Sequence, residues 1–377
     1  IGTFKLVKVV EAMREKIVAL GGDIRFQHRV SNVRLTTSEG AQHVTSLTVR
    51  RLDTDELFEM PVKRVVLALG HSARDAFAML FDAGVFMEAK PFSVGFRIEH
   101  PQSVIDRARW GRHAGHPLLG AADYKLVHHA RNGRAVYSFC MCPGGTVVAA
   151  TSEAGRVVTN GMSQYSRNER NANAGIVVGI EPGDFPQSFP QDTPLWTAAF
   201  GETDGSRYAA QASALAAAGK SHPLAGVVMQ RQLEARAFDL GGATYEAPGQ
   251  TVGDFIAAQP STELGTVTPS YQPGVKLVDL AQALPAYAIE AMREALPVFG
   301  RKIKGYDMAD AVLTGVETRT SSPLRITRGA DFQSLNTRGI FPAGEGAGYA
   351  GGILSAGVDG IKVAEAVARD ALGLAQT

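Results

Sequence analysis

The spacing of apolar residues at the start of the chain predicts an amphipathic helix over residues 6–20. Apolar side chains recur there at intervals of three and four positions, and the paired glycines Gly21 and Gly22 end the pattern. Alternation of apolar and polar residues then replaces the helical spacing, which indicates short β-strands. These strands are expected over residues 23–30, 33–37, 44–52 and 58–61.

An unbroken apolar run over residues 64–70 predicts a different kind of strand. The run ends at Gly70, and it is typical of a parallel strand that is buried on both faces. Near the end of the chain the same order of strand, turn and helix returns. A short strand over 339–343 leads into a glycine-dense loop, and a long helix rich in alanine and valine follows over 354–372.

The segment between these two strand–turn units is richer in short strands and turns. A helix over 72–83, capped by Ser72, opens it. Short strands and glycine turns follow from residue 92 to residue 254, with a proline-rich surface loop over 182–194. Strands are expected over 93–98, 135–141 and 147–150, and helices over 208–220 and 278–296, the last broken at Pro285.

Composition restricts the class of protein. Of the 377 residues, 45% are hydrophobic and 20% are charged, as in an ordinary globular protein. The formal net charge is +1 and no basic stripe is visible, so neither nucleic acid nor a membrane surface is expected as a partner. No apolar run approaches the roughly 20 residues that a membrane span needs. The two cysteines fit a reducing compartment, so a cytoplasmic location is expected.

The glycine-dense loop is the strongest candidate for a ligand site. Five glycines fall between Gly344 and Gly352, and ordering so many glycines costs conformational entropy. That cost is tolerated where backbone amides must approach a ligand closely. The helix that follows directs its unpaired N–H groups and its positive dipole end back into the loop, which favours an electron-rich group such as a flavin. The alternative is a glycine-rich turn that serves close packing only.

Two other segments could complete a nucleotide site. The strand over 64–70 ends in a small-residue turn, and Gly21 and Gly22 precede a strand on which an adenine could lie. Glu345 could accept hydrogen bonds from ribityl hydroxyls. The expected cofactor-binding residues are Val30, Ala68, Gly70, Gly344, Glu345, Gly346, Ala347, Gly348, Gly351, Gly352 and Ile353.

Four residues are candidates for catalysis. His71 follows the buried strand, where it could transfer a proton or simply stabilise the turn. Arg97 could bind a substrate carboxylate, although a surface ion pair with Glu99 is the simpler explanation. Arg319 and Arg325 flank a turn of small polar residues that could hold an anionic substrate or the flavin edge.

The two cysteines lie two positions apart, at Cys140 and Cys142. On a strand they point the same way, and a flavin enzyme could use such a pair for thiol exchange. The alternative is that both are buried and inert, since two residues is a strained span for a disulfide. Two cysteines without matched histidines provide too few ligands for a metal, and no metal is expected.

Several strings of the sequence resemble a family of bacterial FAD-dependent dehydrogenases, among the flavoproteins with two dinucleotide-binding domains. The segment GIFPAGE at 339–345 is similar to their last flavin-binding strand and turn, where most members have Asp in place of Glu345. The strings that carry the closer likeness are ALGHSARD (68–75), KPFSVG (90–95), SFCMCPGG (138–145), TNGMS (159–163), GVETRTSSP (315–323) and PAGEGAGYAGG (342–352).

The resemblance implies an α/β fold in which a partial, Rossmann-like FAD-binding domain is interrupted by a large, mixed, β-rich α+β domain. Residues 1–74 and 333–377 would form the nucleotide-binding part, and residues 75–332 the inserted substrate domain. It also implies an N-terminal Gly-x-Gly-x-x-Gly unit for the FAD pyrophosphate, which this chain does not contain. We therefore expect this polypeptide to bind FAD weakly or not at all.

The expected activity is that of an FAD-dependent oxidoreductase. Hydride or electrons would pass between the flavin and a small-molecule substrate, with NAD(P)H as a candidate electron donor. The alternatives are a flavin-binding sensor or scaffold without turnover and, more simply, an interaction domain without a ligand. Neither the substrate nor the oligomeric state follows from the sequence.

Overall fold

The computed structural model of the chain describes residues 2–38 and 40–374. The chain is a mixed α/β protein, and it divides into two compact units. The first, here called the sheet unit, comprises residues 1–22, 93–180 and 230–320. The second, here called the glycine-loop unit, comprises residues 23–92, 181–229 and 321–377.

The boundaries of these units differ from those expected for the domains. The segments 75–92, 181–229 and 321–332 pack within the glycine-loop unit, and residues 1–22 belong to the sheet unit. Pairings between distant segments explain the difference, because they draw parts of the middle of the chain into the glycine-loop unit. For example, Asp82 accepts hydrogen bonds from Arg207 at 2.9 and 3.1 Å. Whether residues 1–74 and 333–377 act as a nucleotide-binding domain stays a prediction.

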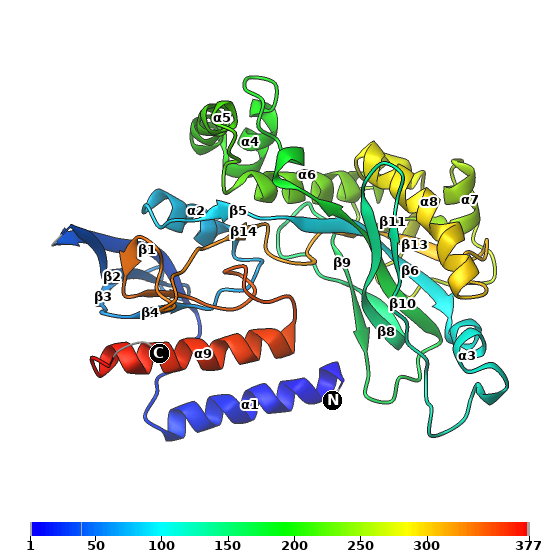
Figure 1. The fold of residues 1–377 in the computed structure, drawn as a ribbon, viewed down its shortest axis with the longest axis horizontal. Coiled ribbons are helices and arrows are strands. Elements are labelled where there is room, and N and C mark those ends of the chain that lie inside the picture. Colours follow the sequence, from blue (N-terminus) through cyan, green and yellow to red (C-terminus); the bar gives the residue numbers. More distant parts are fainter. Residues whose placement is uncertain (1, 39, 375–377) are drawn as a thin grey trace. The chain divides into compact units, whose positions relative to one another are not determined.

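The sheet unit is built on one large mixed sheet (Figure 1). The neighbouring strands run in the order β12, β11, β13, β6, β10, β8 and β7, and β9 also pairs with β8. Their bounds are β6 (Phe92–Pro101), β7 (Val127–His129), β8 (Ala135–Ala149), β9 (Thr159–Ser163), β10 (Asn171–Ile180), β11 (Ala247–Thr251), β12 (Val275–Leu277) and β13 (Val312–Glu317). Nearly every residue of β6 and β10 is buried, so these central strands lie inside the core.

Helices of the sheet unit cover this core. The helix α8 (Ala286–Lys302) buries an apolar face that includes Met292 and Phe299, and it contacts β10, β8 and β7. Pro285 is its N-cap, so the expected helix over 278–296 begins after this proline. The other elements are α3 (Gln102–Trp110), η1 (Gly111–His113), α7 (Val252–Ala257), η3 (Leu280–Gln282) and α6 (Ala225–Leu240), which begins in the glycine-loop unit.

The expected first helix is confirmed as α1 (Thr3–Ala19). It is attached to the sheet unit at its start, where Thr3 Oγ1 donates to the Ser163 carbonyl at 3.4 Å and the ammonium of Lys5 lies 3.7 Å from the Tyr165 ring centroid. Its apolar residues, such as Val10 and Met13, are exposed. The amphipathic pattern was therefore a correct guide to the helix, but its apolar face is not covered by the described residues.

In the glycine-loop unit, an antiparallel meander joins β1 (His28–Ser38), β2 (Ala41–Arg51) and β3 (Leu57–Pro61), and β15 (Thr337–Arg338) adds to β2 in parallel. The expected strand over 23–30 is wrong in its start. The chain turns through Gln27, which has a positive φ of 58°, and enters β1 only at His28.

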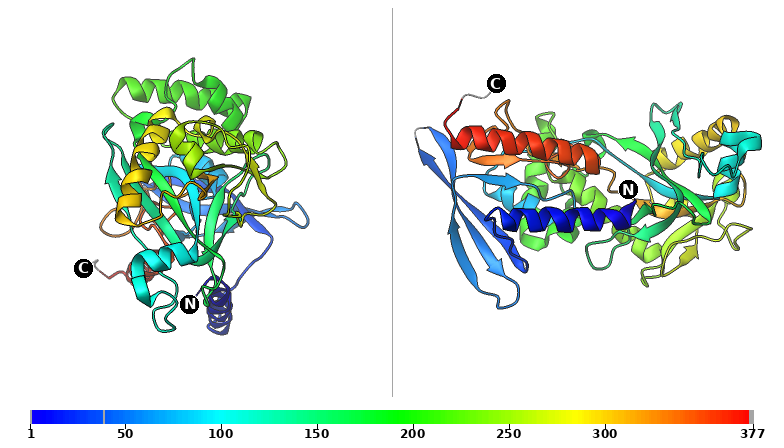
Figure 2. Two further views of the ribbon diagram at one scale, coloured as in Figure 1. Left: turned by 90° about the vertical axis from the view of Figure 1, so that its right-hand side faces the viewer. Right: turned by 90° about the horizontal axis from the view of Figure 1, so that it is seen from below.

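A short parallel pair carries the candidate loop. The strand β4 (Val65–Leu67) pairs with β16 (Ile340–Pro342), which confirms the parallel arrangement expected from the sequence. The expectation that β4 is buried on both faces is wrong, however, because the Val66 side chain is 45% exposed whereas Leu67 is 6% exposed. The helix α9 (Ile353–Ala371) packs on β16, with Val363 and Ala366 against the strand side (Figures 1 and 2).

The remaining elements of the glycine-loop unit are β5 (Glu88–Ala89) paired with β14 (Leu324–Arg325), and the helices α2 (Arg74–Asp82), η2 (Pro182–Asp184), α4 (Thr193–Phe200) and α5 (Glu202–Ala217). Ala73, not Ser72, is the N-cap of α2, so the expected cap is wrong. The expected proline-rich loop over 182–194 contains η2 and the start of α4.

None of the helices within the described residues is both long enough and apolar enough to cross a membrane. Residues 2–38 and 40–374 contain no group of three or more His, Cys, Asp or Glu side chains placed to hold a metal ion.

Candidate functional site

The turns that follow β4 and β16 lie against each other. Because parallel strands end at the same edge, the turn at Gly70 and the loop at Gly346 leave the pair side by side. A Cβ on Gly346 would lie only 2.3 Å from the carbonyl oxygen of Gly70. Glycine is therefore required at Gly346 by contact between two backbones.

The glycines of the loop fall into two groups. Gly344 and Gly348 have positive φ values of 69° and 84°, which side chains rarely adopt, and a Cβ on Gly348 would also lie 2.9 Å from the Leu324 carbonyl oxygen. Packing and backbone geometry account for these positions. A Cβ on Gly351 or Gly352 would meet nothing within 4 Å in the described chain. Internal packing therefore gives no reason for glycine at these two positions, where an external ligand could approach.

The same two glycines lead directly into α9. Gly352 is the N-cap of the helix and has extended backbone with a φ of 169°. Because glycine has no side chain, the N-cap residue cannot form a side-chain hydrogen bond to the first turn. The amide of Gly351 donates to Ser355 Oγ at 3.3 Å. Ile353 is 69% exposed. The N–H groups of this first turn have no partners within the helix, and they are available to an electron-rich ligand.

An ion pair braces the loop against α9. Arg328 Nη2 donates to Asp359 Oδ1 at 2.5 Å, and Arg328 Nη1 donates to the Pro342 carbonyl at 2.7 Å. Asp359 Oδ2 accepts from the Gly344 amide at 2.7 Å. Burial disfavours the carboxylate, but these hydrogen bonds lower the pKa of Asp359 below its ordinary value. Asp359 thus acts as an ionised brace. Sequence analysis missed both residues, because no spacing rule connects them.

A cluster of charged side chains lies beside the loop. His71 Nε2 is 3.8 Å from Glu345 Oε1, and each side chain is about a quarter exposed. Lys90 Nζ donates to Ser321 Oγ at 3.2 Å and to the Ser322 carbonyl at 3.4 Å. The structure therefore brings together two of the predicted residues, His71 and Glu345.

The pKa values of this cluster link its members. Burial raises the pKa of Glu345, and the positive charge of Lys90 partly offsets the effect. Burial also lowers the pKa of Lys90, as does the nearby charge of Arg325, whereas Glu345 acts in the opposite direction. Arg325, a predicted catalytic residue, therefore belongs to the same neighbourhood, and its backbone contacts Gly348. Lys90 was missed because a lysine before a proline has no distinctive sequence signal.

The other predicted cofactor residues lie in the same unit but differ in their exposure and contacts. Val30 lies on β1 and is 40% exposed. Ala68 is exposed just after β4. Ala347 is buried, and its carbonyl accepts from the Ile326 amide at 3.2 Å. Contact of any of them with FAD stays a prediction.

Arg97 is not at the surface, and the expected surface ion pair with Glu99 is wrong. Its side chain is 0% exposed, and Nε donates to Glu317 Oε2 at 2.6 Å. Its Nη1 donates to the Cys140 carbonyl at 2.8 Å and its Nη2 to Asn160 Oδ1 at 3.0 Å. The reason is that β6 is a central strand covered on both faces, so its polar residues must find partners inside the core.

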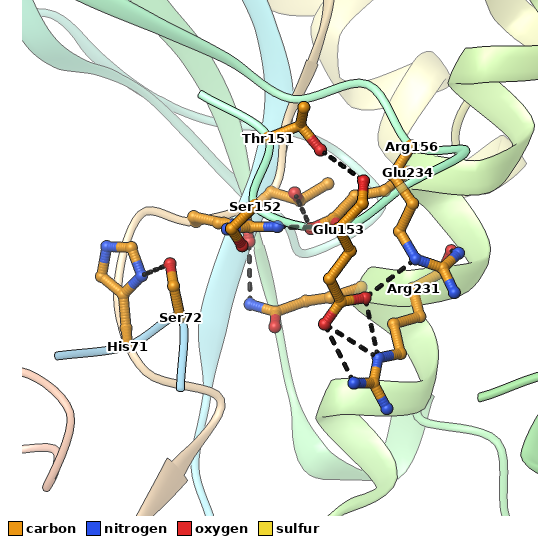
Figure 3. A network of polar contacts seen from close by, with 11 residues as sticks. His71, Ser72, Thr151, Ser152, Glu153, Arg156, Arg231 and Glu234 are labelled. Carbon is orange, nitrogen blue, oxygen red and sulfur yellow. Dashed lines mark hydrogen bonds and ion pairs between the residues drawn. The ribbon is translucent and has the colours of Figure 1, made fainter. Parts of the chain in front are cut away.

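A shared ligand site at Arg319 and Arg325 stays a prediction, and the two residues belong to different units: Arg319 to the sheet unit and Arg325 to the glycine-loop unit. Arg319 Nη2 donates to Glu234 Oε2 at 3.1 Å, and Nη1 donates to Ser152 Oγ at 2.7 Å. Figure 3 shows Ser152 and Glu234 in this network. The guanidinium is thus held by protein groups.

Three further polar contacts appear in Figure 3. Glu153 accepts from Arg231 Nη2 at 2.9 Å and from Arg156 Nε at 2.9 Å, which ties α6 to the segment after β8.

The Nδ1 atom of His71 and the Oγ atom of Ser72 are 3.1 Å apart (Figure 3). Ser72 therefore orients His71 instead of capping α2.

Comparison with known proteins links the chain to flavin-dependent proteins. A family model described as "FAD-dependent protein, C-terminal domain-like" matches residues 91–217 and 209–320. A curated protein of Clostridium beijerinckii, named "Uncharacterized protein", is 43% identical over 366 residues, which cover 97% of this chain and 61% of that protein. The chain thus spans about three-fifths of the length of this relative. The resemblance to FAD-dependent proteins seen in the sequence is confirmed, and the chain belongs to the family described as FAD-dependent protein, C-terminal domain-like.

Proposed function

We propose that this chain is part of an FAD-dependent oxidoreductase, and that Gly351, Gly352 and the first turn of α9 form its flavin-contacting surface. Family membership supports an association with FAD. The observation that carries the proposal is the open space at Gly351 and Gly352, where packing within the described chain gives no reason for glycine. FAD, when bound, supplies hydride and electron transfer through its isoalloxazine ring.

The residues around this surface fit such a group. The amides at the start of α9 and the positive end of its dipole favour negative charge on the ligand. Lys90 and Arg325 add positive charge near Glu345 in the same unit. These groups would orient a flavin by its electron-rich edge and stabilise the charge that it gains on reduction.

His71 and Glu345 are the groups best suited to hold a proton. Their reactive atoms are 3.8 Å apart, and burial raises the pKa of Glu345. A carboxyl with a raised pKa keeps its proton to higher pH, so the pair can donate or accept a proton at Glu345 Oε1 or His71 Nε2. The substrate is proposed to be a small molecule, and NAD(P)H is proposed as a candidate electron donor.

Titration of the protein with FAD, followed by quenching of flavin fluorescence, tests this assignment. Wild-type protein is expected to give weak but saturable quenching, because the chain does not contain the N-terminal Gly-x-Gly-x-x-Gly unit for the pyrophosphate. Gly351→Val is expected to weaken it further, because the new side chain occupies the space proposed for the ligand. The matched control is Gly360→Val, at a position in α9 where a Cβ also meets nothing within 4 Å in the described chain. Circular dichroism confirms that both variants fold.

Two outcomes contradict the proposal. One is the absence of saturable binding by the wild-type protein, since the surface would then lack affinity for flavin. The other is equal binding by wild type and Gly351→Val, since the flavin would then contact a different part of the chain.

A flavin-binding sensor or scaffold without turnover is the second candidate. It is favoured by Arg97 and Arg319, two expected catalytic residues whose guanidinium groups are engaged in buried ion pairs. Bleaching of the flavin absorbance by NADH or NADPH, followed by recovery with an electron acceptor, supports the enzyme. A flavin that no donor reduces supports the sensor.

A further inference from the structure

The strand β8 carries a bulge at its two cysteines. Asn173 of β10 pairs with Cys142, whereas Gly175 pairs with Phe139, so two residues of β8 face a single residue of β10. Cys140, inside the bulge, has a φ of 43°, which is uncommon for a residue other than glycine. Bulges of this kind redirect side chains and are frequent next to active sites.

The bulge separates the two thiols into different environments. Cys140 is exposed and Cys142 is buried. Cys142 Sγ donates to the Cys140 carbonyl at 3.4 Å. The same carbonyl accepts from the buried guanidinium of Arg97 at 2.8 Å. Cys140 is therefore the more accessible of the two cysteines, and its backbone carbonyl contacts both a buried cation and the second thiol.

These neighbours decide which sulfur ionises. The side-chain interaction with Cys142 and the charge of Arg97 lower the pKa of Cys140, against the effect of its partial burial. The hydrogen bond with Cys140 and burial raise the pKa of Cys142. A thiolate is the reactive form of cysteine, and the attacking residue is therefore Cys140.

Cys140 opens into a cavity in the sheet unit. The cavity has a volume of about 720 Å³, within the range that holds a small molecule. Arg109, Lys125 and Asp123 are among its lining residues, which gives the wall one excess positive charge. Ser138 and Met141 also line the cavity. Such a cavity favours an anionic ligand over a cationic one.

We propose that Cys140 is a nucleophile that exchanges with small anionic disulfides in this cavity. Its thiolate forms a bond to one sulfur of the disulfide while the disulfide bond breaks. The second sulfur leaves as a thiolate and takes a proton from solvent. Cys140 is oxidised to a mixed disulfide and the departing sulfur is reduced, so the disulfide itself is the oxidant. Cys142 remains a thiol and acts as a positioning residue that stabilises the Cys140 thiolate.

The test measures modification by glutathione disulfide and by 5,5′-dithiobis(2-nitrobenzoate), with peptide mapping by mass spectrometry. The wild-type protein is expected to carry the adduct at Cys140. The rate is expected to reach half its maximum at a pH below the ordinary thiol pKa of about 8.5. Cys140→Ser is expected to lose the modification. Cys142→Ala is expected to keep it at Cys140, with the pH midpoint shifted upward because the stabilising hydrogen bond is gone.

The charge of the cavity is tested separately. Lys125→Ala is expected to slow the reaction with the two anionic disulfides several-fold and to leave cystamine, a cationic disulfide, unaffected or faster. Modification of Cys142 before Cys140 would overturn the proposal, as would a pH midpoint that Cys142→Ala does not move. Equal slowing of anionic and cationic disulfides by Lys125→Ala would overturn the choice of an anionic partner.

Discussion

The charged groups of the sheet unit and those of the glycine-loop unit are arranged in opposite ways. In the sheet unit, the ion pairs of Arg97 with Glu317 and of Arg319 with Glu234 are almost completely buried. In the glycine-loop unit, His71 and Glu345 are each about a quarter exposed and remain 3.8 Å apart. The first arrangement buries its charges in pairs, whereas the second keeps its charged groups partly exposed, where a ligand can reach them. Burial thus separates structural charges from candidate functional ones.

The largest expected effect comes from breaking a buried pair in the sheet unit. Arg97→Met leaves the Glu317 carboxylate buried without its cation, and loss of one partner of a buried pair costs about 3–5 kcal/mol. Urea unfolding is expected to show this loss. The control is Arg325→Met on the exposed side of the glycine-loop cluster, which is expected to change stability by less than about 0.5 kcal/mol. Equal effects of the two substitutions would remove the distinction between the two regions.

A smaller effect is expected inside the glycine loop, where two of the glycines differ in their surroundings. Gly346→Ala forces a methyl group to within 2.3 Å of the Gly70 carbonyl oxygen, and such overpacking costs about 1–3 kcal/mol. Gly351→Ala places its methyl group in open space and is expected to stay within about 0.5 kcal/mol of the wild type. Thermal unfolding compares the two. A stable Gly346→Ala variant would show that the turn after β4 can yield.

The smallest effect concerns the pH dependence of stability. The pKa of Glu345 in the folded protein is raised above its ordinary value of 4.5, so the folded state binds more protons than the unfolded state just above that pH. The contribution of protonated Glu345 to the free energy of unfolding is fully present below about pH 4.5, and it is lost as pH rises through the raised pKa. Glu345→Gln is therefore expected to match the wild type near pH 4 and to be slightly more stable at pH 7, by less than about 0.5 kcal/mol.

Asp359 provides the opposite case for the same measurement. Its pKa is lowered from 3.8, so it stabilises the fold above that pH and loses this contribution as pH falls through the lowered pKa. Asp359→Asn is expected to be less stable than the wild type at pH 7, with a difference that shrinks on acidification. The same sign for both variants would contradict the assignment of one carboxyl as a brace and the other as a proton-holding group.

Local patterns in the sequence predicted the elements around the candidate site. Helical spacing identified α1, and the alanine- and valine-rich segment after the glycine loop identified α9. The apolar run ending at Gly70 identified β4 as a parallel strand. These features depend on residues near one another in the sequence, or on a general property of parallel strands, and both can be inferred without coordinates. The contact between Gly70 and Gly346 was not predicted as such; the sequence suggested only that the two segments could belong to one nucleotide site.

Features that depend on distant partners were not predictable. Arg97 is paired with Glu317, 220 residues away, and nothing in the alternation of β6 indicated burial on both faces. Arg328 and Asp359 are linked only by the fold, and Lys90 joins Glu345 from another segment. The sequence also suggested one role for all the loop glycines, whereas their surroundings divide them into a packed group and an open group.

The two attachments of α9 have a mechanical consequence. Arg328 holds the helix at Asp359, and Arg64 Nε donates to Asp370 Oδ2 at 2.5 Å near its other end. At about 1.5 Å per residue, these points are roughly 16 Å apart, so the helix between them behaves as a rod fixed at two supports. The start of α9, from Ile353 to Asp359, lies outside the segment that these two ion pairs hold. It can adjust its position by small bending while the rod behind it stays still.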